Sequence, residues 1–92
     1  EGVIHQLVAD KNIAYHAGKS QLPNGETEVN GVSIGIELIN TERDSYTLKQ
    51  YQSVKSLIVK LKKDSSIKYI LGHKDIAPGR KTDPWNFDWD KL

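Results

Sequence analysis

The chain has 92 residues, with 13 Lys or Arg against 12 Asp or Glu and no cysteine. A chain of this length buries one modest core, about 60 to 65% of its unfolded surface, so we expect a single domain over residues 1–92. The balanced charge gives no general attraction to nucleic acid or membrane surfaces, the absence of cysteine excludes a disulfide framework, and no apolar run approaches the roughly 20 residues that cross a bilayer.

The first predicted element is a strand over Val3–Val8, whose side chains alternate between two faces. His5 is then a strand residue without a chemical role. The stretch Gly18–Gly31 is polar and rich in Gly and Asn, and Asn24-Gly25 predicts a turn. A loop of this length is typically either functional or mobile, and both interpretations stay open.

A second strand is predicted over Val32–Leu38, where bulky apolar residues alternate with Ser33, Gly35 and Glu37. The small residues leave room above the sheet, and the carboxylate of Glu37 would point into that room. Two interpretations follow from the residues alone. Glu37 is either a functional carboxylate or a solvated side chain on the wet face of an antiparallel strand.

A helix follows, with Thr47 as its N-cap and an apolar stripe at spacings of three and four residues. The stripe consists of Leu48, Tyr51, Val54, Ile58 and Leu61. Lys62 and Lys63 fall at the expected C-terminal end, where cations complement the helix dipole. The basic run is short and lacks interleaved aromatic residues, so it does not predict nucleic-acid binding. We therefore expect this helix to be structural.

The segment Gly72–Asp83 is the hardest to explain as scaffolding. Tyr69–Leu71 predicts a short buried strand that ends at His73. Pro78-Gly79 predicts a turn that carries Asp83 back toward that histidine. Imidazole and carboxylate are both zinc ligands, so the pattern is typical of a metal-binding loop. The alternative, in which the histidine only ends a strand and the aspartate only caps a turn, stays open because a catalytic zinc usually takes three protein ligands.

The tail from Trp85 to Leu92 places aromatic residues at alternate positions. They are Trp85, Phe87 and Trp89. Large aromatic side chains of this kind bury much area, so we interpret them as packing anchors rather than as a platform for a ligand.

Three segments, Gly72–Pro84, Ser33–Leu38 and Tyr15–Gly18, together resemble the zinc-dependent N-acetylmuramoyl-L-alanine amidases of the type-2 family. This family is related to the peptidoglycan recognition proteins and the phage amidase lysozymes. The resemblance runs from about Val3 to Leu92 and implies hydrolysis of the amide bond between the lactyl group of N-acetylmuramic acid and L-alanine, in peptidoglycan or muropeptides. The alternative is a non-catalytic peptidoglycan-binding module.

Position by position, the resemblance implies a zinc enzyme. His73 and Asp83 match ligands of a Zn²⁺ cofactor. Lys81 matches the residue that stabilises the oxyanion, and Glu37 matches the residue that activates the attacking water. The presence of all four residues favours the enzyme over the binding module, because such modules typically lack part of the zinc set.

Two further residues match positions beside the substrate. Arg80 corresponds to a substrate-adjacent position in the members that cleave anhydromuropeptides, and His16 corresponds to a recurrent histidine near the cleft that does not bind metal. Tyr15 departs from the tryptophan often found at its position.

The family's first zinc ligand is a histidine on a central strand upstream of every matched segment. We therefore expect the chain to be the C-terminal portion of a longer catalytic domain, incomplete at its N-terminus and lacking that histidine. His5 and His16 lie at positions that the family does not use for metal. On its own, the chain is expected to bind zinc weakly and to show little activity.

The expected fold is α/β, a mixed β-sheet flanked by helices, with the cleft across the strand ends. We expect a monomer that binds peptidoglycan or muropeptides, without a nucleic-acid partner and without membrane insertion. Intact peptidoglycan and released anhydromuropeptides are both compatible with the sequence, as are cytoplasmic, periplasmic and secreted locations.

Overall fold

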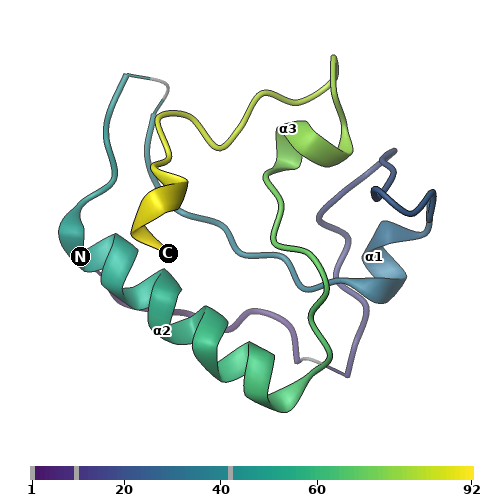
Figure 1. Cartoon of the computed structure of the whole chain (residues 1–92), viewed down its shortest axis with the longest axis horizontal. Coiled ribbons are helices and arrows are strands. Elements are labelled where there is room, and N and C mark those ends of the chain that lie inside the picture. The colour runs from purple at the N-terminus through teal and green to yellow at the C-terminus, as the bar shows by residue number, and fades with distance from the viewer. Residues whose placement is uncertain (1, 10, 42) are drawn as a thin grey trace. The chain divides into compact units, whose positions relative to one another are not determined.

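The computed structural model describes residues 2–9, 11–41 and 43–92. The elements in these ranges are helices (Figure 1): α1 (Val29–Val32), α2 (Leu48–Asp64), α3 (His73–Ile76) and the 3-10 helix η1 (Trp89–Lys91). The chain divides into two compact units. The first contains the described residues of Glu1–His5, Leu38–Ile70 and Trp85–Leu92, and the second those of Gln6–Glu37 and Leu71–Pro84.

The described residues contain no β-strand, so the predicted α/β fold with a mixed sheet is wrong. The predicted strands over Val3–Val8, Val32–Leu38 and Tyr69–Leu71 form no paired ladder. A strand is stable only when neighbouring strands and a packed face support it. Here the apolar side chains stay open to solvent instead, with Leu7 87% and Ile36 41% exposed. Apolar and polar residues do alternate in these segments, but among the described residues no neighbouring strand pairs with them to form a sheet.

Helix α2 begins and continues as the sequence predicts. The Thr47 hydroxyl accepts a hydrogen bond from the Gln50 N–H at 3.1 Å, and the Gln50 side chain accepts one from the Thr47 N–H at 2.9 Å. This reciprocal capping box satisfies two backbone donors at the start of the helix. The predicted N-cap is therefore confirmed. Of the predicted stripe, Tyr51 and Val54 are buried and Ile58 and Leu61 are half-buried, whereas Leu48 is 66% exposed.

Thr47→Ala is expected to destabilise the chain by about 1 kcal/mol, because it removes the side-chain half of the cap. The measurement is urea unfolding followed by far-UV circular dichroism. Thr27→Ala is the matched control, since Thr27 is exposed and lies outside the helices; its effect is expected to stay within about 0.5 kcal/mol. Equal losses in the two variants would contradict a capping role.

Aromatic side chains hold the first unit together. Phe87 contacts Tyr46, Tyr51 and Trp89, with ring centroids 5.4, 5.3 and 4.7 Å away, mostly edge to face. The Tyr51 hydroxyl also accepts a hydrogen bond from the Asp88 N–H at 2.9 Å, which fixes the start of η1 beside α2 (Figure 1). Phe87 and Trp89 thus pack as the sequence predicts.

A small apolar cluster forms the core of the second unit. Its buried members come from the 17–29 segment and from α3: Ala17, Val29, Ile76 and Ala77, with Leu22 packed against them. The predicted turn at Asn24-Gly25 is present, with Gly25 at φ 91° and its N–H donating to the Leu22 carbonyl at 2.9 Å. A backbone hydrogen bond from Gln21 to the Ile76 carbonyl, 2.8 Å long, ties this segment to α3.

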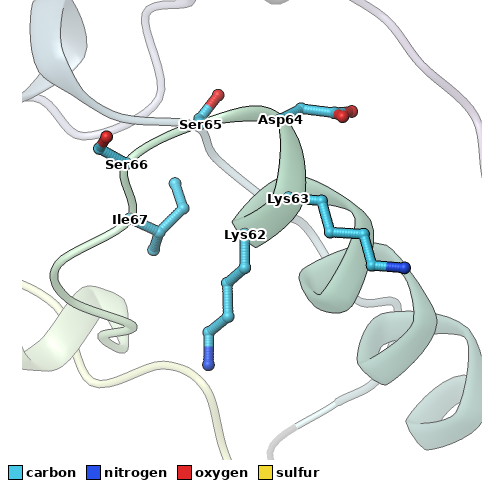
Figure 2. Close-up of a pocket in the computed structure, with 6 residues that line it drawn as sticks. All are labelled: Lys62, Lys63, Asp64, Ser65, Ser66 and Ile67. Carbon is cyan, nitrogen blue, oxygen red and sulfur yellow. The ribbon is translucent and has the colours of Figure 1, made fainter.

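A shallow hollow lies at the C-terminal end of α2 (Figure 2). It is lined by Lys62, Lys63, Asp64, Ser65, Ser66 and Ile67. The side chains of Lys62 and Lys63 extend in different directions, so the hollow presents no converging set of ligands. The helices in the part of the chain that the structure describes are also too short or too polar to cross a bilayer.

Candidate functional site

His73 is held by one capped helical turn and does not end a strand. Tyr69–Leu71, predicted to be a buried strand, is irregular, and its side chains are partly open to solvent. Gly72 precedes α3, and its N–H donates to Asp75 Oδ2 at 2.8 Å. The Ala77 N–H donates to the His73 carbonyl at 3.0 Å and closes the turn. A short helix cap thus positions the imidazole where a strand terminus was expected.

The chain then reverses and returns Asp83 to His73. The predicted Pro78-Gly79 turn is present, and Gly79 has φ 81°, a conformation that glycine adopts without steric cost. The Lys74 N–H donates to the Asp83 carbonyl at 2.8 Å and closes the loop. As a result, His73 Nδ1 lies 3.3 Å from Asp83 Oδ2, with both side chains partly exposed.

Both nitrogens of the His73 ring face acceptors. Nδ1 faces the Asp83 carboxylate, and Nε2 lies 3.3 Å from the Ala17 carbonyl oxygen. A neutral imidazole carries one N–H and can satisfy only one of these partners. Satisfying both requires either a doubly protonated ring or another cation between Nδ1 and the carboxylate. The geometry fits a neutral ring that donates to one of the two acceptors, and it also fits a cation between Nδ1 and the carboxylate.

This pair fits part of a zinc site. Ligand atoms 2.0 to 2.2 Å from a tetrahedral zinc lie about 3.3 to 3.6 Å apart, which matches the separation of His73 Nδ1 and Asp83 Oδ2. The Nε2–H would then donate to the Ala17 carbonyl, the kind of outer contact that orients metal-binding histidines. Within residues 2–9, 11–41 and 43–92, no group of three or more His, Cys, Asp or Glu could hold a metal. The described residues therefore supply two of the three protein ligands that are usual for catalytic zinc.

His16 lies near the His73–Asp83 pair, but its side chain contacts Ser33 instead. Its Nε2 is 3.0 Å from Ser33 Oγ, and the Ser33 hydroxyl donates to the Val29 carbonyl, so the imidazole is the donor to Ser33. Burial, with a smaller contribution from His73, holds the pKa of His16 below its usual value. The ring packs directly over Gly35, where a Cβ would lie 2.7 Å from His16 Cγ. His16 is thus a neutral donor with a fixed ring, and the hydroxyl beside it is not activated as a nucleophile.

The structure connects some of the other predicted site residues to the His73–Asp83 pair by hydrogen bonds and leaves others apart from it. Arg80 Nε donates to the Lys19 carbonyl at 3.0 Å, and its Nη2 donates to the Ala17 carbonyl, which also faces His73. Lys81 is half-buried in the same loop. Glu37 is exposed, and no contact among the described residues joins its carboxylate to His73.

Two sets of backbone contacts in the site could not be predicted from the sequence. The Ala17 carbonyl accepts from Arg80 and faces His73 Nε2, and the Asn30 side chain accepts from the N–H groups of His16 and Ala17 at 3.1 and 2.8 Å. An alanine carries no side-chain signal for the use of its carbonyl. The only indication in the sequence was the position of this segment among the three that resemble the amidases.

Comparison with known proteins identifies the family. The model of the family described as N-acetylmuramoyl-L-alanine amidase (Amidase_2) matches residues 1–86. The chain belongs to this amidase family. The resemblance noted from the sequence is thereby confirmed, and the loop that joins His73 to Asp83 lies inside the matched region of the amidase chain.

Several curated relatives align with nearly the whole amidase chain. It is 43% identical over 96 residues to 1,6-anhydro-N-acetylmuramyl-L-alanine amidase AmpD of Escherichia coli K12, an alignment that covers 100% of this chain and 51% of AmpD. AmpD of Enterobacter cloacae is 39% identical over 95 residues, with 100% and 50% covered. N-acetylmuramoyl-L-alanine amidase AmiD of Escherichia coli K12 is 37% identical over 101 residues, with 97% and 36% covered. The chain spans about half the length of the AmpD relatives, and no solved structure matches it significantly.

Proposed function

We propose that the protein is a zinc-dependent amidase that cleaves the bond between the lactyl group of N-acetylmuramic acid and L-alanine. The observation that carries the proposal is the His73–Asp83 pair, 3.3 Å apart, with acceptors on both sides of the imidazole. Membership of the N-acetylmuramoyl-L-alanine amidase family supports the same chemistry. A peptidoglycan-binding module without catalysis would not need a cation between these two side chains.

His73 and Asp83 would hold the metal through Nδ1 and Oδ2. When bound, zinc acidifies water and polarises a carbonyl group. Glu37 would take the proton of the attacking water and deliver it to the departing alanine nitrogen, a role that its exposed carboxylate allows. Lys81 would place its ammonium group beside the carbonyl oxygen, where negative charge develops. His16 and Arg80 would lie beside the substrate.

The substrate class follows from the relatives. AmpD carries 1,6-anhydro-N-acetylmuramyl-L-alanine in its name and is 43% identical to this chain, whereas AmiD is 37% identical. The six AmpD relatives, 38 to 43% identical over 98 to 100% of this chain, support an anhydromuropeptide over intact peptidoglycan. A monomer suffices for the chemistry because the proposed ligands and the proposed base come from one unit of one chain.

The test combines zinc content with cleavage. Elemental analysis after dialysis gives zinc per chain, and mass spectrometry follows release of the stem peptide from an anhydromuropeptide and from purified cell-wall sacculi. Both are measured on this chain and, where the gene encodes residues upstream of Glu1, on the full-length product. Bound zinc with cleavage of the muropeptide supports the proposal. Binding of muropeptide without zinc and without cleavage would favour the recognition module instead.

A further inference from the structure

Side chains contact both the N–H and the carbonyl of Ala17. The N–H donates to Asn30 Oδ1 at 2.8 Å, and the carbonyl accepts from Arg80 and lies 3.3 Å from His73 Nε2. Ala17 is also the most deeply buried of the core residues, with 1% of its surface exposed. A carbonyl held in this way is a rigid acceptor, and the ring that donates to it is oriented by it.

Arg80 is the residue that reaches across to this carbonyl. Its guanidinium bridges the carbonyls of Ala17 and Lys19, with Nε 3.0 Å from the Lys19 oxygen. The planar guanidinium presents several N–H groups in a fixed arrangement, so it can bond two carbonyls at once. Gly18 lies between the two carbonyls and makes this approach possible: it has φ 61°, and a Cβ there would lie 3.0 Å from Arg80 Nη2.

The Ala17 carbonyl affects which nitrogen of a neutral His73 ring carries the proton. Beside the Asp83 carboxylate alone, the neutral ring would place its proton on Nδ1 and donate to the carboxylate, which blocks Nδ1 as a metal ligand. The Ala17 carbonyl offers Nε2 a competing partner. With the proton on Nε2, the lone pair of Nδ1 faces the carboxylate and is available to a cation.

We propose that Arg80 is a positioning residue for the metal ligand His73, acting through the Ala17 carbonyl rather than by touching the metal. This inference rests on the proposed zinc function. It gives the guanidinium of Arg80 a role that is separate from contact with substrate. Gly18 belongs to the same arrangement, because a Cβ there would lie 3.0 to 3.3 Å from three guanidinium atoms, which would have to shift, and because its φ of 61° favours glycine.

The experiment compares four variants. Arg80→Gln removes the charged guanidinium, and Gly18→Ala shifts the guanidinium while keeping Arg80. Arg43→Gln is the control for the first, since Arg43 is an exposed arginine of the other unit. Gly25→Ala is the control for the second, since Gly25 also has a positive φ, 91°, and a Cβ there would meet no atom closer than 3.8 Å.

Two measurements are made on each variant. Competition with a chromogenic chelator gives zinc affinity, and long-range ¹H–¹⁵N correlation spectra of the metal-free chain, recorded where His73 is neutral, give its tautomer. Loss of an outer-shell partner typically costs about 10- to 100-fold in metal affinity. We expect a loss of that size in Arg80→Gln and Gly18→Ala, with a shift of His73 from the Nε2–H to the Nδ1–H form, and neither change in the controls.

The outcomes separate this proposal from the proposed function. Unchanged zinc affinity and an unchanged His73 tautomer in Arg80→Gln would overturn the positioning role, and a raised KM alone would assign Arg80 to substrate. If the unsubstituted chain and the full-length product bind no zinc, the zinc function fails. The tautomer of the metal-free chain still decides whether Arg80 acts on His73.

Discussion

Asp83→Ala is expected to abolish stoichiometric zinc binding. The substitution removes one of the two ligand atoms that converge on the cation position, and the loss should exceed the roughly 100-fold caused by deleting an outer-shell partner. The backbone bond from the Lys74 N–H to the Asp83 carbonyl does not use the side chain, so the loop itself should close normally. Chelator competition and elemental analysis measure the effect.

The matched control is Asp64→Ala, which removes an exposed carboxylate at the end of α2. This variant should bind zinc as the parent chain does. If Asp83→Ala kept one zinc per chain after dialysis, Asp83 would not be a ligand, and the contact with His73 would be a simple charge-assisted hydrogen bond.

Lys81→Ala is expected to keep zinc and lose turnover by about a hundred- to a thousandfold, the usual cost of deleting a donor that stabilises developing negative charge. Lys81 is half-buried in the loop between the two proposed ligands, and its backbone N–H, which alanine retains, donates to the Ala77 carbonyl at 2.9 Å. Turnover is measured on an anhydromuropeptide with the most complete form of the protein that shows activity.

Lys74→Ala provides the comparison within the same loop, because Lys74 is exposed and its backbone bond to Asp83 also survives the substitution. Its turnover should be close to that of the parent. A Lys81→Ala variant with undiminished turnover would remove Lys81 from the mechanism. Loss of zinc in that variant would make it a structural residue of the loop.

The features that sequence predicted correctly are those determined by near neighbours. Thr47 and Gln50 are three residues apart, and their capping box follows from local geometry. The return of Asp83 to His73 follows from the Pro78-Gly79 turn between them. Each of these structures forms through contacts within one short stretch of chain, so residue type and spacing contain most of the necessary information.

The features that sequence missed depend on distant partners. Strand pairing over Val32–Leu38 required neighbours that residue alternation cannot supply, and the segment carrying Glu37 is irregular. The contact of Arg80 with Ala17 joins residues 63 positions apart through a backbone oxygen. Since every residue has a carbonyl, nothing in the amino-acid type marks the one that is used.

The closed loop between Lys74 and Asp83 limits where the chain can change in length. One backbone hydrogen bond and one glycine turn set the spacing of the two candidate ligands. Insertions in the 18–28 segment would leave that spacing intact, whereas a one-residue deletion between the two ligands would destroy it.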